Sequence, residues 1–123
     1  MLAPARSLGA DPRWQVVYRL STGPADWWER INSGRIALRI DSGIIRALYS
    51  SGADGKGTLD SCRFENTWGE SLDERIYSDG GDGAKRYKLG RQVAFLYAMD
   101  ASQDSRAGSR GIVIEAAIGH LSD

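Results

Sequence analysis

The side chains of this 123-residue chain that could perform nucleophilic or acid–base chemistry show no catalytic arrangement, and the spacing of its 16 carboxylates singles out no pair. The chain has one cysteine, Cys62, and one histidine, His120. Such a pair forms a nucleophile and its base only when the fold places the two within hydrogen-bond reach. Cys62 alternates with Phe64, which is typical of a buried small apolar residue, and His120 follows the last predicted strand. We therefore expect no catalytic residue and no enzymatic activity.

Two glycine-rich acidic segments resemble metal-binding loops without completing one. In Gly52–Asp60, placing Gly57 at the sixth position of a calcium-binding EF-hand loop puts Arg63 at the twelfth, where a glutamate is needed. The segment Asp79–Gly83 offers two carboxylates, but its glycines are typical of a tight connection. One cysteine and one histidine cannot supply the usual ligands of a zinc site, and no nucleotide-binding glycine motif is present. We expect no metal ion and no cofactor.

Aromatic residues give the clearest indication of a binding surface. Trp27 and Trp28 are adjacent, so both cannot easily enter one core, and Trp68 stands in a predicted turn. The alternative is that Trp27 closes one end of the core and Trp68 packs beneath its own loop. Exposed aromatic residues and arginines are enriched at recognition sites. We predict a recognition surface of three tryptophans, one tyrosine and two arginines, namely Trp27, Trp28, Trp68, Tyr49, Arg39 and Arg46.

The charge balance limits the class of partner. Lys and Arg total 16, and Asp and Glu total 16, so the formal net charge is zero. Nucleic-acid binding depends largely on excess positive charge, so we do not expect nucleic acid as a partner. No segment is long and apolar enough to cross a membrane, and the first residues lack the apolar core of a secretory signal. A single cysteine excludes an intramolecular disulfide. We expect a soluble, cytoplasmic protein that does not contact membranes.

Alternation of apolar and polar residues predicts that strands position these side chains. A short helix is expected at residues 27–32 with Asp26 as its cap, and a strand is the competing interpretation. The expected strands cover residues 14–20, 62–66, 72–77, 91–99 and 112–118, together with a hairpin over 35–49 that turns at residues 41–43. The last strand places Ile112, Ile114, Ala116 and Ile118 on one face, and the charged run 72–77 suits a sheet edge.

Two glycine–arginine pairs, Gly34-Arg35 and Gly90-Arg91, precede alternating runs. We interpret each glycine as a turn into the sheet and each arginine as a solvated side chain. The run that contains the second pair, residues 87–93, is similar to segments of small bacterial barrel domains, although it identifies no family.

The number and spacing of the strands predict an all-β fold with minor α content. Roughly six to eight strands, with turn signals about every ten residues, favour a small antiparallel β-barrel, SH3-like or OB-like, with one short helix. A β-sandwich is the alternative. We expect residues 1–12 to form a flexible N-terminal arm and residues 13–121 to form a single β domain.

These observations favour a non-enzymatic protein-interaction or self-associating module, whose partner is another protein or a second copy in a homodimer. The near-zero charge and the open sheet edges support this interpretation. One alternative is an OB-like single-stranded nucleic-acid binder that stacks bases on Trp28, Tyr49 or Trp68. The other is a small-ligand carrier or enzyme that uses a barrel cavity.

Overall fold

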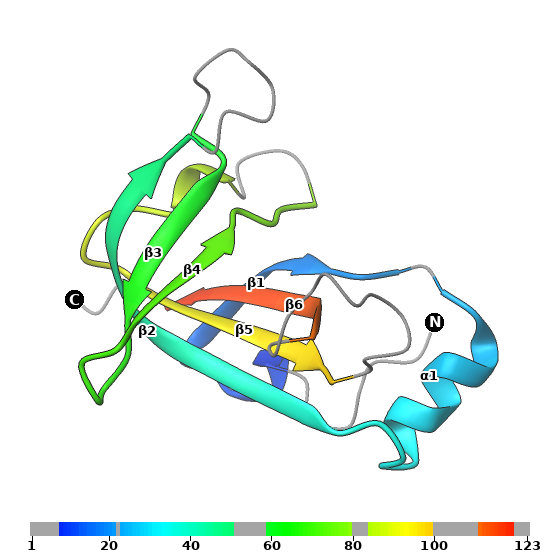
Figure 1. Ribbon diagram of the computed structural model, residues 1–123. Helices are drawn as coiled ribbons and strands as arrows, with labels where there is room; N and C mark the ends of the chain where they lie inside the picture. Colours follow the sequence, from blue (N-terminus) through cyan, green and yellow to red (C-terminus); the bar gives the residue numbers. More distant parts are fainter. Residues whose placement is uncertain (1–7, 22, 51–58, 80–83, 100–110, 120–123) are drawn as a thin grey trace.

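A computed structural model gives the fold and describes residues 8–21, 23–50, 59–79, 84–99 and 111–119 (Figure 1). His120 and most of the two acidic glycine-rich segments lie outside these residues, as does the first part of the predicted N-terminal arm. The described elements are, in chain order, η1 (Leu8–Ala10), β1 (Trp14–Arg19), α1 (Ala25–Asn32), β2 (Leu38–Tyr49), β3 (Ser61–Glu65), β4 (Ser71–Arg75), η2 (Ala84–Arg86), β5 (Gln92–Ala98) and β6 (Ile112–Gly119).

The six described strands form one antiparallel sheet in the order β1-β6-β5-β2-β3-β4. The prediction of an all-β fold with one short helix is confirmed, and so is the edge position of the run that contains β4. No pairing joins β1 to β4 in the described part of the chain, so the predicted closed barrel is not confirmed. The two edges are nevertheless linked, because the backbone N–H of Asp79, which follows β4, donates to Val17 O in β1 at 3.0 Å.

The sheet curls so that one face, which we call the inner face, packs against itself (Figure 1). The ring centroids of Phe64 in β3 and Phe95 in β5 lie 5.4 Å apart, and those of Tyr18 and Tyr77 lie 5.0 Å apart. These contacts bring β3 and the segment after β4 over the central strands. The buried residues of the inner face are Val17, Ile45, Cys62, Phe64, Tyr87, Val93, Phe95, Tyr97, Val113, Ala116 and Ile118.

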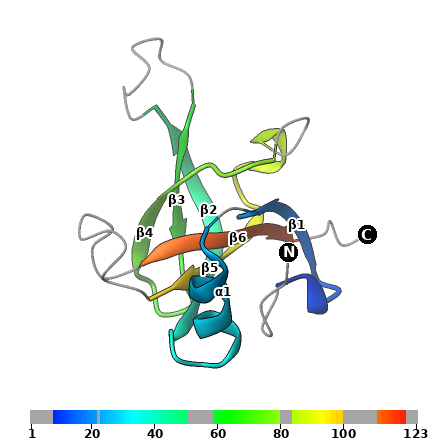
Figure 2. The same cartoon turned by 90° about the vertical axis from the view of Figure 1, so that its right-hand side faces the viewer.

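The opposite face of the sheet, which we call the helix face, packs against α1 and η1. Figure 2 shows α1 at one end of the sheet, with β3 and β4 behind it. The sheet contributes small residues such as Ala94, Ala98 and Ala117 to this cluster, and α1 contributes large ones. The packed residues are Leu8, Trp27, Trp28, Ile31 and Ile36 on one side, and Ala94, Leu96, Ala98, Ile114 and Ala117 on the other.

Both adjacent tryptophans are buried, which corrects the expectation that they could not share a core. Trp27 is 4% exposed and Trp28 is 7% exposed, and their rings meet edge to face with centroids 5.0 Å apart. An edge-to-face pair packs favourably, so the two rings fill one cluster together. The predicted cap of α1 is also wrong: Pro24 is the N-cap, and Asp26 lies within the first turn, where its charge favours the helix dipole.

The predicted hairpin over residues 35–49 is a single strand, β2, because this segment pairs with two neighbours in succession. Its first part, Leu38 to Ile44, pairs with β5, and its last part, Ile44 to Tyr49, pairs with β3. Gly43, which is predicted to lie in a turn, instead allows the backbone of Glu65 to pack closely against β2. A Cβ at Gly43 would lie 2.3 Å from the carbonyl oxygen of Glu65.

A β-bulge in β6 breaks the face that the sequence predicted. Ile114 belongs to the helix face, whereas Ala116 and Ile118 belong to the inner face. The register shift places Glu115 opposite Leu96 and buries it completely. Its carboxylate accepts hydrogen bonds from the backbone N–H of Leu8 at 2.7 Å and from Arg19 Nε at 3.0 Å. Leu8, inside the segment predicted as an arm, is therefore packed against the sheet.

Candidate functional site

The turn between β3 and β4, residues 66–70, holds a tryptophan in solvent; we call it the Trp68 turn. The side-chain oxygen of Asn66 accepts hydrogen bonds from the backbone N–H groups of Trp68 and Glu70, both at 2.9 Å. Its amide nitrogen donates to Glu70 Oε1 at 3.0 Å. Gly69 has a φ of 82°, a conformation that favours glycine, and its N–H donates to Asn66 O at 3.1 Å. The asparagine therefore fixes the backbone on both sides of the indole.

Trp68 is 83% exposed, the highest value among the exposed large apolar residues that the structure describes. An indole carries a large apolar area, and leaving it in water forgoes the stabilisation that burial would give. The hydrogen bonds of the turn do not require a tryptophan at this position, because they use only its backbone. A partner that covers the ring would meet a turn whose backbone is already fixed, which lowers the entropic cost of binding.

A pocket of about 300 Å³ adjoins this turn; we call it the open pocket. It is built from four parts of the sheet that are distant in sequence. Its lining residues are Arg13 and Trp14 at the start of β1, Ser42, Gly43, Ile44 and Arg46 of β2, Glu65, Asn66 and Thr67 at the end of β3, and Gln92 of β5.

The open pocket lies on the same side of the sheet as α1. Residues directly opposite each other in neighbouring strands share a face, and Ser42 pairs with Ala94 of the helix face. Ile44, two residues further along β2, pairs with Gln92 on that same face. Trp14 also packs against the helix-face cluster. Among the described residues, the helix face is therefore covered by α1 at one end and carries the open pocket at the other.

Two arginines stand at the walls of the open pocket. Arg46 occupies a β-bulge of β2, between Ile45 and Ala47, which directs its side chain outward. Its Nη2 lies 3.4 Å from Glu65 Oε1, and its side chain is 55% exposed. Arg13 is held by Asp11, with Nη2 to Oδ2 at 2.8 Å and Nε to Oδ2 at 3.1 Å. These hydrogen bonds lower the pKa of the Asp11 carboxyl below its ordinary value, so the pair stays charged.

The family model described as Immunity protein RhsI2 matches residues 21–119 of the chain. The chain belongs to this family. The matched residues include α1, all strands from β2 to β6 and the Trp68 turn. No curated protein matches the chain. Membership of the RhsI2 family agrees with the interpretation as a small, non-enzymatic protein-interaction module. No helix in the described residues is long and apolar enough to cross a membrane.

Only two of the six residues predicted for the recognition surface of this RhsI2-family chain adjoin the open pocket. Arg46 lines it, and Trp68 follows Thr67, which also lines it. The remaining four take part in contacts within the chain. Trp27 and Trp28 belong to α1, and their side chains are buried in the helix-face cluster, so they do not contribute to an exposed surface.

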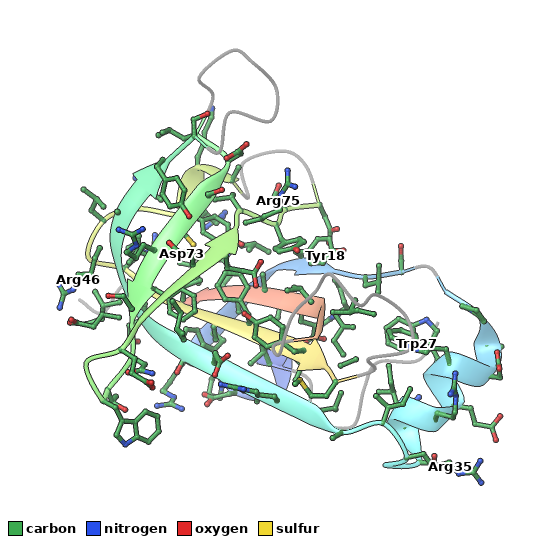
Figure 3. All side chains as sticks on the ribbon, in the orientation of Figure 1. Tyr18, Trp27, Arg35, Arg46, Asp73 and Arg75 are labelled. Carbon is green, nitrogen blue, oxygen red and sulfur yellow. The ribbon has the colours of Figure 1, made fainter. Side chains whose placement is uncertain are left out.

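The other two residues have intramolecular partners near the surface. The hydroxyl of Tyr49 donates to Asp73 Oδ1 at 3.0 Å, and the guanidinium of Arg63 lies 5.8 Å from the Tyr49 ring centroid. Arg39 Nε donates to Asp41 Oδ1 at 3.1 Å. Figure 3 shows Arg46 and Asp73 in the region of β2, β3 and β4, whereas Arg35 lies at the far end, beside α1.

Sequence reasoning missed Arg13, Gln92 and Asn66 as members of the pocket. Arg13 and Gln92 reach it only because β1, β5 and β2 lie in one sheet, and no local pattern reveals that order. Asn66 had a local signal, since an asparagine three residues before a glycine is typical of a turn stabilised by its side chain.

The thiol of Cys62 does not provide a nucleophile in this RhsI2-family fold. Burial, with the nearby Glu74 and Asp73 charges, raises the pKa of the Cys62 thiol to about 12. The same inner face raises the pKa of Tyr77 to about 12, again mainly by burial. At neutral pH both groups therefore keep their protons, and their contribution is packing.

Proposed function

We propose that the chain is an immunity protein that binds a toxin domain and neutralises it by direct, non-covalent contact. The single observation that supports this is the family match over residues 21–119, which covers the whole sheet except β1. The exposed Trp68 beside the open pocket supports a protein partner, because aromatic residues and arginines dominate the binding energy of protein interfaces.

The proposed mechanism is occlusion. A rigid sheet that covers part of a toxin prevents the toxin from reaching its target, and this requires no turnover by the chain itself. The neutral net charge is compatible with a toxin surface that carries mixed charges. The proposal includes a cytoplasmic location, which the single cysteine favours because it has no disulfide partner in the chain.

The experiment tests protection and binding separately. Candidate toxin domains from the organism that encodes this chain are expressed one at a time in a bacterial host, with and without the chain. We expect one domain that arrests growth alone and is tolerated when the chain is present. The purified pair is then titrated by calorimetry, and a one-to-one complex is expected. Protection without a stable complex would contradict the proposed occlusion.

A further inference from the structure

We propose that the toxin docks on the open end of the helix face, with the Trp68 indole in an apolar cleft of the toxin and a toxin carboxylate on Arg46. This inference rests on the proposed function. It names the surface and the chemistry of the partner, which the family match leaves open. Three features of the described residues carry it: the rigid turn, the pocket beside it and the arginine at its wall.

The first feature is the exposed indole on a turn with a fixed backbone. Trp68 is 83% exposed, and the Asn66 side chain fixes the backbone at residues 68 and 70 through two hydrogen bonds of 2.9 Å. Tryptophan is among the residues most enriched at binding hot spots. Because the backbone of the turn is already fixed, only the side-chain freedom of the indole is lost when a partner covers it. The turn therefore has the structure of an anchor for an apolar cleft.

The second feature is the space beside that anchor. The open pocket has a volume of about 300 Å³, at the small end of the range for cofactor and substrate sites. Its wall includes Thr67, the residue before the anchor, and its remaining lining mixes apolar and polar groups. One or two side chains of a protein partner would fill it. A toxin segment seated here would contact the indole and the pocket at the same time.

The third feature is charge complementarity. The lining of the open pocket carries two guanidinium groups, from Arg13 and Arg46, and one carboxylate, from Glu65. The two hydrogen bonds of the Arg13 side chain to Asp11 Oδ2 are 2.8 and 3.1 Å long, whereas the Arg46–Glu65 contact is 3.4 Å. A guanidinium has five N–H donors in a planar fork that suits a carboxylate. Arg46 is therefore the group placed to bind an aspartate or glutamate of the toxin.

The experiment uses the full chain and the purified toxin domain that the growth assay identifies. The test variants are Trp68→Ala and Arg46→Glu. Their matched controls are Leu59→Ala, an exposed apolar residue beyond the opposite end of β3, and Arg35→Glu, at the end of α1 far from Arg46 (Figure 3). Dissociation constants are measured by calorimetry at low and high salt, and thermal unfolding checks that each variant is folded.

We expect Trp68→Ala to weaken binding at least about 30-fold, as a hot-spot residue does. Arg46→Glu should weaken binding and reduce or reverse its salt dependence, because it replaces an attractive charge pair at the interface with a repulsive one. Both controls should bind within about threefold of the parent chain. Both test variants should unfold near the parent temperature, since their side chains are exposed.

Other outcomes would separate the failure of this inference from that of the proposed function. If the parent chain binds no toxin domain, the proposed function fails. If the parent binds but both test variants bind equally well, the function stands and the docking surface is wrong. If Trp68→Ala leaves toxin affinity unchanged and converts a dimer to a monomer in light scattering, a second copy of the chain occupies this surface instead, which also overturns the inference.

Discussion

Glu115 is an acidic side chain in β6, next to the edge strand β1, and it is completely buried between β1 and β5. The bulge in β6 turns it to the helix face, where the Leu8 backbone and the Arg19 guanidinium bind its two oxygens. A buried carboxylate costs several kcal/mol unless it is neutralised. The Glu115 carboxylate therefore links η1 and β1 to β6.

Removing the positive partner should cost more than removing the negative charge. Arg19→Met keeps much of the side-chain volume but leaves the Glu115 carboxylate less neutralised, and we expect a loss of about 3 kcal/mol in the free energy of unfolding. Glu115→Gln should cost less, because its amide oxygen can still accept from Leu8 and the Arg19 side chain is 40% exposed to water. Urea denaturation measures both. A larger loss for Glu115→Gln would contradict the buried-charge explanation.

Stability should fall in alkaline solution because of groups on the inner face. Burial raises the pKa of Cys62 from 9.0 to about 12, and that of Tyr77 from 10.0 to about 12. Between pH 9 and 12 the unfolded chain releases these protons while the folded chain keeps them, so the free energy of unfolding decreases as pH rises. Below pH 9 this stabilisation is fully present.

Urea midpoints measured from pH 8 to pH 11.5 test this prediction. The decline should become shallower in Cys62→Ala, first around pH 9, where the thiol of the unfolded chain loses its proton ahead of the tyrosine hydroxyls. Since this variant also loses packing, its slope against pH is compared rather than its absolute stability. A midpoint that is constant over this range would contradict the assignment.

At the scale of elements, the length of β2 decides the shape of the molecule. Its first part extends the central sheet beside β5, and its last part carries the β3–β4 hairpin. The strand can serve both because Gly43 lets the backbone of Glu65 pass at a distance that no side chain would allow. The same crossing brings Glu65 and the Trp68 turn to the open pocket.

Alanine substitutions at two glycines separate this contact from backbone conformation. Gly34→Ala should cost about 1 kcal/mol, since Gly34 has a φ of 83° but no neighbour within 4 Å of an added Cβ. Gly43→Ala should cost about 3 kcal/mol, because its Cβ would lie 2.3 Å from Glu65 O and the strands must separate. Thermal unfolding of the two variants gives the comparison. Equal losses of stability in the two variants would show that the contact between Gly43 and the Glu65 backbone is not tightly packed.

Local patterns predicted the elements well and their partners poorly. The strands at residues 14–20, 62–66, 91–99 and 112–118, the short helix and the turn at Trp68 follow from alternation and turn residues, and the structure confirms them within one or two residues. The prediction of a hairpin at Gly43 was wrong, because the sequence alone does not distinguish a glycine that allows close packing from a glycine that forms a turn. The bulge at Glu115 and the sheet order depend on long-range pairing, so the open pocket could not be predicted.

At the scale of the whole molecule, one strand supports both cores. Residues 93–98 of β5 are all buried, with Val93, Phe95 and Tyr97 on the inner face and Ala94, Leu96 and Ala98 on the helix face. Neither core can lose its packing while β5 remains in place for the other. The domain should therefore unfold as one cooperative unit.

Two probes on opposite faces of the sheet test this. The change in tryptophan emission reports mainly on the buried Trp27 and Trp28 of α1, on the helix face. Reaction of Cys62 with a thiol reagent reports on the inner face. We expect both to show the same urea midpoint. A thiol that becomes reactive at a lower urea concentration than the emission change would show that the inner face opens separately.

The burial of β5 on both faces also limits which positions of this chain tolerate substitution during evolution. A substitution in β5 must suit two sets of neighbours at once, so few alternatives are tolerated there. The Trp68 turn meets only solvent at its tip, and its hydrogen bonds depend on Asn66 rather than on the indole. Residues at that tip can therefore diverge without any change to the sheet that carries them, and on the proposed function such changes would alter which partner is recognised.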